Sequence, residues 1–225
     1  MAGWLAMIGG GEWKPGCVGF DTDLLALSGG TEVVVLPTAA AMEGPNNALA
    51  NAEKHFTALG ATVIPCRVLS RAEADDPENV AIVAKAKFIY LSSGSAMHLR
   101  STMKGTAVWE ALVASWRNGA VLAASAAGAM ALGDPMVDPR GGAFTLGLGL
   151  FPGLAVVPQA EEWSNERKAR TIKMAGKTTT LALVDQQTAL LRSPEGRWSM
   201  NGAGDVYIVA AGAYLKIDNL HLRIP

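Results

Sequence analysis

The chain has 225 residues, of which 50% are hydrophobic and 17% are charged, and its formal net charge is −1. This length suffices for one domain with a substantial core, and the composition excludes long disordered segments. The balanced charge argues against a nucleic-acid surface or a polybasic membrane patch, and no apolar run reaches the about 20 residues that span a bilayer.

The first two thirds of the chain alternate between apolar runs typical of strands and patterns typical of helices. The opening MAGWLAMIGGGEW has no basic segment before its apolar run, which favours a first strand over a signal peptide. Further strands are expected in TEVVVLPTA, ATVIPCRVL, KFIYLSSG and AVLAAS. Helices are expected from Pro45 to a stop at Gly60, from Asp76, and from Thr106 to a stop at Gly119. This order predicts a mostly parallel sheet with helices on both faces and a ligand site at the carboxyl ends of its strands.

The last third of the chain has a different pattern. A polar, helix-like stretch runs from about Glu161 to Met174, and short strands follow in TTLALVD, TALLRS and RWSM. The segment NGAG predicts a hairpin-like turn before a final strand in DVYIVAAG. We therefore expect antiparallel strands at the edge of the parallel sheet. Neither repeats nor linkers interrupt the sequence, which predicts a single domain over residues 1–225.

The segment VLAASAAGAM, residues 121–130, carries the most specific pattern. An apolar strand running into small residues is typical of the strand-to-helix turn on which hydrolases expose a nucleophile. The N–H groups that follow such a turn can hold an oxyanion. Ser125 is the hydroxyl in this segment and is one candidate nucleophile, although a helix N-cap is an equally good interpretation of it.

Other residue types give weaker indications. The segment GGGEW could cradle a phosphate, but the spacing of a dinucleotide site is missing, so a tight turn is favoured. Cys17 and Cys66 form neither a metal-ligand spacing nor a disulfide framework, and we expect idle, buried thiols. The three histidines, His55, His98 and His221, are scattered singly. No metal and no cofactor are predicted.

Several segments taken together resemble peptidase family S51, which includes cyanophycinase and dipeptidase E. They are MIGGGEW, LPTAA, YLSSGSAMHLR, SAAGAM, GLGLFPG, VDQQTALL and GAGDVYIV, and they extend over nearly the whole chain. The resemblance implies a three-layer α/β/α sandwich of the flavodoxin-like, class I glutamine amidotransferase-like kind. This expectation agrees with the alternation of strands and helices.

The resemblance also implies where a catalytic triad would lie. The family's turn reads Gly-Thr/Ser-Ser-Ala-Gly-Ala-Met, so aligning AGAM puts Ala126 at the nucleophile and Ser125 one place before it. The histidine position falls on Gln159 in VVPQAEEW, and the acidic position falls on Gln186 in LVDQQTALL. Alanine has no attacking oxygen, glutamine takes up no proton near neutral pH, and it brings no negative charge to an imidazolium. All three catalytic positions therefore depart from the family together.

Three functions follow as hypotheses. The first is a family member without peptidase catalysis that acts as a binding or scaffolding protein. The second is an active hydrolase of aspartyl peptides that uses Ser125, with Glu161 and Glu162 as weak candidate bases and His98 interpreted as structural. The third is a flavodoxin-like module that binds a small molecule or an anion and uses GGGEW.

A binding function would use the turn that the resemblance identifies. The N–H groups of Ala127 and Gly128 and the backbone at Gly94 are expected to form an anion-binding concavity, and Arg100 is a candidate partner for a carboxylate. The expected ligand is a small acidic molecule or peptide. The expected location is the cytoplasm, without nucleic-acid or membrane partners, and a homo-oligomer is compatible with the sequence.

Overall fold

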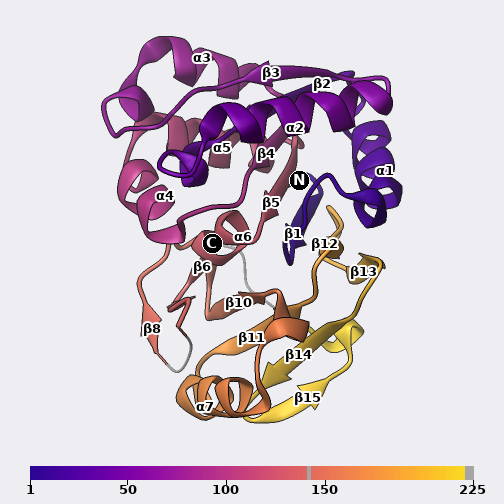
Figure 1. Cartoon of the computed structure of the whole chain (residues 1–225), viewed down its shortest axis with the longest axis vertical. Coiled ribbons are helices and arrows are strands. Elements are labelled where there is room, and N and C mark those ends of the chain that lie inside the picture. The colour runs from indigo at the N-terminus through magenta and orange to yellow at the C-terminus, as the bar shows by residue number, and fades with distance from the viewer. Residues whose placement is uncertain (141–142, 221–225) are drawn as a thin grey trace.

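A seven-stranded sheet forms the centre of the computed structural model, which describes residues 1–140 and 143–220. The strand order is β13-β12-β1-β5-β4-β2-β3, and the five strands β1 to β5 pair in parallel (Figure 1). β12 and β13 extend the sheet in antiparallel fashion beside β1. The strand bounds are β1 Leu5–Ile8, β2 Glu32–Leu36, β3 Thr62–Pro65, β4 Phe88–Leu91, β5 Val121–Ser125, β12 Thr188–Arg192 and β13 Trp198–Gly202. The predicted mostly parallel sheet with antiparallel C-terminal strands is confirmed.

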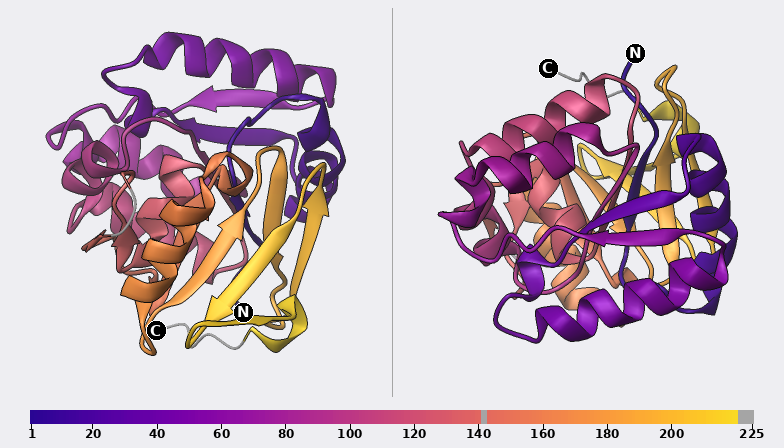
Figure 2. Two further views of the ribbon diagram at one scale, coloured as in Figure 1. Left: turned by 60° about the horizontal axis from the view of Figure 1, so that its bottom comes forward. Right: turned by 90° about the horizontal axis from the view of Figure 1, so that it is seen from above.

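Helices cover both faces of this sheet, as the alternation predicted (Figure 2). Side chains alternate along each strand, so Leu5 and Met7 of β1 belong to one hydrophobic cluster while Ala6 and Ile8 belong to the other. The second cluster includes residues of α1 and α2, and the first includes residues of α3, α4, α5 and α6. The helix bounds are α1 Val18–Ser28, α2 Pro45–Ala58, α3 Pro77–Lys85, α4 Ala96–Met103, α5 Ala107–Arg117 and α6 Ala127–Leu132. The α/β/α sandwich is therefore confirmed.

Local signals set the ends of the predicted helices. The Asp76 carboxylate accepts a 2.8 Å hydrogen bond from the Glu78 N–H and caps α3, which begins at Pro77. Gly60 and Gly119 follow the ends of α2 and α5 with φ of +81° and +107°, a backbone conformation that glycine adopts without steric penalty. The helices therefore stop where the glycines predicted.

A second sheet lies beside the first and holds the strands β10, β11, β14 and β15 in that order (Figure 1). Their bounds are Leu154–Pro158, Thr180–Val184, Val206–Ala210 and Ala213–Leu215. The expectation that TTLALVD and DVYIVAAG extend the parallel sheet was wrong, and so was the hairpin at NGAG, because β13 and β14 belong to different sheets. Both sheets contribute to one hydrophobic cluster, so the burial pattern of a strand did not reveal its sheet.

Shorter elements complete the described chain. Two pairs of two-residue strands are formed by β6 Gly133–Asp134 with β9 Phe151–Pro152 and by β7 Met136–Val137 with β8 Phe144–Thr145. The polar helix expected from about Glu161 is shorter than predicted: α7 spans Asn165–Ala175, with Ser164 as its N-cap, and follows a 3-10 turn at Ala160–Glu162.

The two cysteines are free thiols, and each of the two described histidines makes a hydrogen bond within the fold. Cys17 and Cys66 are buried free thiols, and burial raises the pKa of each to about 12. His98 is half-buried, with Nε2 2.9 Å from the Leu69 carbonyl oxygen. His221 lies outside the described residues. Among residues 1–140 and 143–220, no group of three or more His, Cys, Asp or Glu side chains could hold a metal ion, and no helix is long and apolar enough to cross a bilayer.

Candidate functional site

The sharp turn between β5 and α6 has Ala126 at its tip. The backbone of Ala126 has φ +42° and ψ −102°, whereas Ser125 is the last residue of β5 and Ala127 the first of α6. The Ala126 N–H donates to the Ile8 carbonyl at 2.9 Å, which fixes the turn against β1. A Cβ on Gly128 would lie 2.9 Å from the Leu91 carbonyl oxygen, so glycine allows α6 to approach β4. This is the strand-turn-helix geometry of a nucleophile elbow, with a methyl group at the position of the nucleophile.

Ser125 points away from the tip of the turn. Its side chain is fully buried, and its Oγ donates a 2.8 Å hydrogen bond to Oε2 of Glu12. The other oxygen of Glu12 accepts the Ser93 N–H at 3.0 Å. The interpretation of Ser125 as an N-cap was wrong, because the N-cap of α6 is Ala126 and no side chain caps it.

Glu12 is a residue of this site that sequence reasoning missed. It lies in the loop after β1 and joins that loop to the end of β5 and to the loop after β4. Its position directly after three glycines, at the carboxyl end of a strand, was the available signal. The segment GGGEW thus supports the elbow through a side chain that points into the protein.

Gln159 lies beside Ala126. It follows β10 with φ +52°, and its N–H donates to the Gly9 carbonyl at 2.8 Å. A Cβ placed on Gly10 would lie 3.3 Å from Gln159 Cγ and 3.5 Å from Ala126 Cβ. Both side chains therefore border Gly10, and any larger residue there would crowd both of them.

Gln186 lies on the far side of the same glycine loop. Its Oε1 is 3.2 Å from the position that a Cβ on Gly11 would occupy. Its Nε2 donates to Glu162 at 2.5 Å, and its backbone N–H donates to Glu161 at 3.1 Å. Both candidate bases are thus bonded to Gln186.

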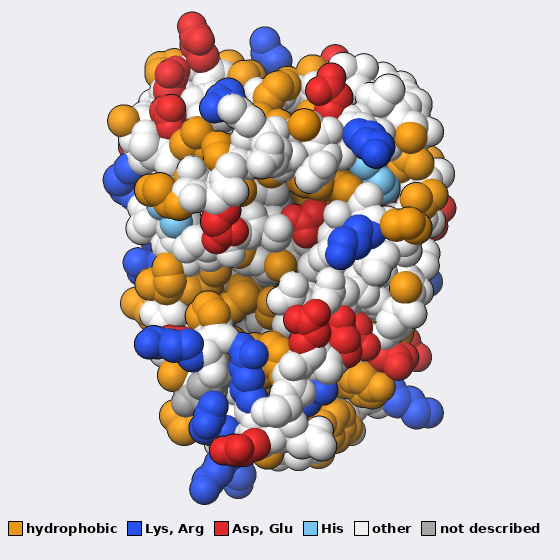
Figure 3. All heavy atoms as spheres, viewed as in Figure 1, with side chains coloured by type: hydrophobic (Ala, Val, Ile, Leu, Met, Phe, Trp, Pro, Cys, Tyr) orange, Lys and Arg blue, Asp and Glu red, His pale blue; other side chains and the backbone are white. Residues whose placement is uncertain are grey.

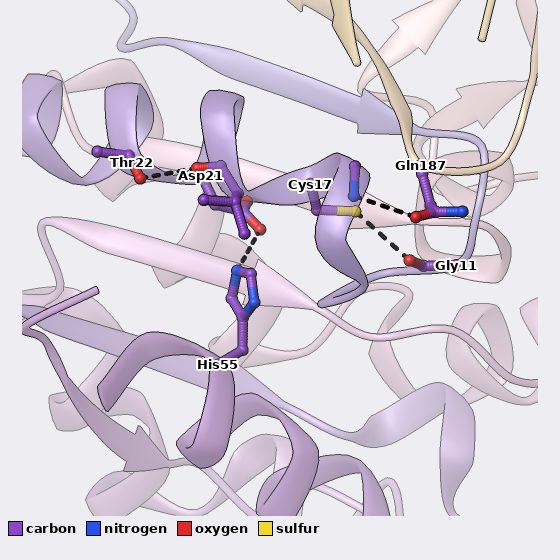
Figure 4. A network of polar contacts seen from close by, with 8 residues as sticks. Gly11, Cys17, Asp21, Thr22, His55 and Gln187 are labelled. Carbon is purple, nitrogen blue, oxygen red and sulfur yellow. Dashed lines mark hydrogen bonds and ion pairs between the residues drawn. The ribbon is translucent and has the colours of Figure 1, made fainter. Parts of the chain in front are cut away.

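The residue after Gln186 fixes the glycine loop itself. The Gln187 N–H donates to the Gly10 carbonyl at 2.7 Å, and its side-chain Oε1 accepts the Gly16 N–H at 3.1 Å (Figure 4). The thiol of Cys17 donates to the Gly11 carbonyl at 3.4 Å in the same view. The glycine loop, which borders the three positions that the resemblance assigned to the triad, is thereby bonded to Gln187, just before β12, and to the 3-10 turn Pro15–Cys17 that precedes α1.

A small cavity opens at the elbow. Its volume is about 210 Å³. Its lining is mostly apolar and consists of Gly94, Ser95, Ala96, Met97, Ala126, Ala127, Met130, Pro139, Pro158, Gln159, Trp163 and Arg167. The space-filling view shows hydrophobic side chains around a hollow near α6, with Lys and Arg side chains below it (Figure 3). The cavity thus contains two of the three positions that the resemblance assigned to the triad, Ala126 and Gln159.

Arg167 is the charged residue of this lining and was also missed. It lies in the first turn of α7, with its guanidinium carbon 3.4 Å from the ring centroid of Trp163. One Nη donates to the Pro139 carbonyl, and the buried Nε has no hydrogen-bond partner. No carboxylate of the described residues lies within 4.0 Å of this guanidinium, and burial lowers its pKa. The spacing of four residues between Trp163 and Arg167 was the signal in the sequence.

The other predicted binding residues divide into two groups. Gly94 lines the cavity with φ +137°, and a Cβ there would lie 2.3 Å from the Ala39 carbonyl oxygen, so the close approach of this loop requires glycine. Ala127 also lines the cavity, whereas Gly128 packs beneath it against β4. Arg100 is half-buried on α4, and it is not part of the cavity lining.

The comparisons with known proteins agree with this geometry. The model of Peptidase family S51 matches residues 5–196. The structure is similar to the crystal structure of a peptidase from an acI-B1 Actinobacterium, with a TM-score of 0.85, 26% identity, and coverage of 100% of this chain and 97% of that one. A putative Peptidase E protein from Listeria monocytogenes EGD-e has the same fold, with a TM-score of 0.67, 14% identity, and coverage of 91% and 100%. A search of curated proteins finds no significant match.

Proposed function

Because the chain belongs to peptidase family S51, we propose that it is a member of this family that has lost serine-peptidase catalysis and binds a small acidic ligand at the elbow. The observation that carries the proposal is Ala126, whose backbone has the shape of a nucleophile elbow and whose side chain has no oxygen. A strained turn with a methyl group at its tip cannot form an acyl-enzyme.

The surroundings of Ala126 support the loss of catalysis. Gln159, beside it, has no group that accepts a proton near neutral pH, and Gln186 donates its amide to Glu162. In another serine peptidase, loss of the nucleophile and base lowers the rate by roughly 10⁶-fold. We expect a loss of the same order here.

The binding half of the proposal rests on Arg167. Its guanidinium lines the cavity without a carboxylate partner among the described residues, and Trp163 and Pro139 hold it in place. Guanidinium groups bind carboxylates through paired, charge-assisted hydrogen bonds. The backbone at Ala127 and Gly94 borders the same space, so a carboxylate there would meet both charge and backbone.

A hydrolysis assay tests the loss of catalysis. The wild type and Ser125→Ala are incubated with aspartyl dipeptides and with an aspartate–arginine polymer, and we expect no turnover above background from either. Turnover that requires Ser125 would refute the proposal. The triple variant Ala126→Ser, Gln159→His, Gln186→Glu then measures whether the cavity still accepts such peptides.

A second candidate, an active hydrolase that uses Ser125, has one observation in its favour. The Ser125 hydroxyl is 2.8 Å from the Glu12 carboxylate, which is the contact of a hydroxyl with a base. The complete burial of Ser125 and its absence from the cavity lining favour the first candidate. The Ser125→Ala arm of the assay decides between them.

The proposal includes a cytoplasmic location. Cys17 and Cys66 are buried free thiols, which are typical of proteins in a reducing compartment. A homo-oligomer is also compatible with the sequence, and analytical ultracentrifugation would test for it.

A further inference from the structure

We propose that the elbow cavity selects carboxylic acids whose body is neutral and apolar, and that it discriminates against free amino acids and peptide N-termini. The inference rests on the proposed function, because it names the chemical class of the acid that the cavity binds. It follows from the charges that line the cavity and from those that lie near it but outside.

Among the residues that the structure describes, the lining contains one cation and no anion. Arg167 is the charged residue among the twelve that line the cavity, and Gln159 and Ser95 are the polar side chains. Oγ of Ser95 accepts the His98 N–H at 3.2 Å, so it is already engaged as the N-cap of α4. A carboxylate therefore gains an opposite charge in the cavity, whereas an ammonium group finds only neutral acceptors and a guanidinium of its own sign.

The acidic residues nearest the elbow are held by other partners. Both carboxylate oxygens of Glu12 accept hydrogen bonds, from Ser125 and Ser93, on the inner side of the elbow. Asp138 binds Arg140 at 2.7 Å, and the hydrogen bonds from Arg140 lower its pKa to about 2. Neither residue lines the cavity.

Glu161 and Glu162 lie on the other side of the glycine loop. Glu161 accepts the backbone N–H of Gln186, and Glu162 accepts its side-chain amide. Neither glutamate lines the cavity, so no carboxylate among the described residues is part of the wall beside Arg167. Asp138 acts on the charge of Arg167 from outside this wall, and it is bound to Arg140.

The remaining walls are apolar. Besides glycine and alanine they present two methionines, two prolines and a tryptophan: Met97, Met130, Pro139, Pro158 and Trp163. The volume of about 210 Å³ admits only a small molecule. An acid with a hydrocarbon body would bury that body against these side chains, and the α-ammonium of an amino acid would lose water there without a counter-charge.

Calorimetric titration at pH 7 with matched probes tests the inference. The probes are 3-phenylpropionate against L-phenylalanine and 4-methylpentanoate against L-leucine, because each pair differs by one ammonium group. We expect the amino acids to bind at least about tenfold more weakly, since an unpaired ammonium group is desolvated. Gln159→Glu places a carboxylate in the lining and should reduce the ratio between the affinity of each plain acid and that of the matching amino acid.

Two arginines on α7 provide the matched variants. Arg167→Gln should weaken both plain acids at least about tenfold. Arg170→Gln should leave their affinity unchanged, because Arg170 is outside the cavity lining and lies 4.0 Å from Glu166. Circular dichroism of both variants checks that they fold.

The possible results separate the two proposals. Tight binding of the plain acids with weak binding of the amino acids supports both. Amino acids that bind as well as the plain acids, through Arg167, would overturn the selectivity and leave the proposed acid site standing. If none of the four probes binds the wild type, or if Arg167→Gln changes nothing, the acid site itself is refuted and the selectivity falls with it.

Discussion

A buried hydrogen bond between Asp21 of α1 and His55 of α2 gives a prediction that needs no ligand. Asp21 is fully buried, and its Oδ2 lies 2.9 Å from His55 Nε2, while its Oδ1 has no partner (Figure 4). Replacing His55 with leucine removes the hydrogen bond that His55 gives this carboxylate. We expect His55→Leu to destabilise the protein at pH 7, because a buried carboxylate would be left without its hydrogen-bond donor.

The size of the effect has an upper limit. A carboxylate that loses its partner can take up a proton, and for a group with an unfolded pKa of about 3.9 this costs about 4 kcal/mol at pH 7. We therefore expect a loss below about 4 kcal/mol in the free energy of unfolding, because the raised pKa of Asp21 makes its protonation in the folded protein cost less than this limit. In a chain that already carries Asp21→Asn, position 21 has no carboxylate. There, His55→Leu should lower the free energy of unfolding by only about 1 kcal/mol, which is the contribution of a neutral hydrogen bond.

The pH dependence has a definite sign. Burial raises the pKa of Asp21, although its hydrogen bond to His55 opposes the shift. The folded protein therefore holds this proton to higher pH than the unfolded chain, and the stabilisation that results is present below about pH 4 and lost as pH rises through the folded pKa. Asp21→Asn lacks this loss, so its stability relative to the wild type should increase from about pH 4 towards pH 7.

The wild type, His55→Leu, Asp21→Asn and the double variant form a double-mutant cycle. Urea denaturation of these four proteins between pH 4 and 7, followed by circular dichroism, measures the cost of His55→Leu and the pH dependence of stability. The reasoning would be refuted if His55→Leu cost the same in the presence and absence of the Asp21 carboxylate. It would also be refuted if the difference between Asp21→Asn and the wild type did not vary with pH. In either case the buried carboxylate would not be the cause of the destabilisation.

Three further predictions concern the elbow and the thiols. Ala126→Gly should raise the free energy of unfolding in urea by about 1 kcal/mol, because glycine relieves the strain of φ +42° and this gain exceeds its entropic penalty; a loss of stability would contradict the strain. Glu12→Ala should lower the free energy of unfolding by about 3 kcal/mol and speed hydrogen exchange in residues 92–96, whereas Glu12→Gln should retain most of the stability. Equal losses in the two variants would show that the carboxylate is unimportant. Cys17 and Cys66, whose pKa values burial raises to about 12, should react with Ellman's reagent at pH 8 only after unfolding, and a rapid reaction of the folded protein would show accessible thiolates.

Local patterns predicted much of the fold. Asp76 before Pro77 marked the start of α3, and Gly60 and Gly119 marked the stops after α2 and α5. Such signals act within one turn of chain, and a single sequence contains them completely. The parallel sheet followed from the order of these elements, since parallel strands need a helical crossover between them.

The second sheet and the supports of the site did not follow in this way. β11 and β14 alternate or bury their residues as strands of the main sheet do, and only long-range pairing assigns them to another sheet. Glu12 and Arg167 carry ordinary charged side chains in the sequence. Their importance comes from partners more than 25 residues away: Ser93 and Ser125 for Glu12, and Pro139 for Arg167.

The sequence by itself therefore determined which side chains are available at the turn, and the tertiary structure decided what surrounds them. The absence of an oxygen at Ala126 and of an imidazole at Gln159 is a property of residue type and needs no coordinates. The direction of Ser125 into the protein and the exposure of Arg167 to the cavity depend on strand parity and helix packing. Both features arise only when segments far apart in the chain pack against one another. The residue type gives a side chain its charge or polarity, whereas burial decides which partners it meets.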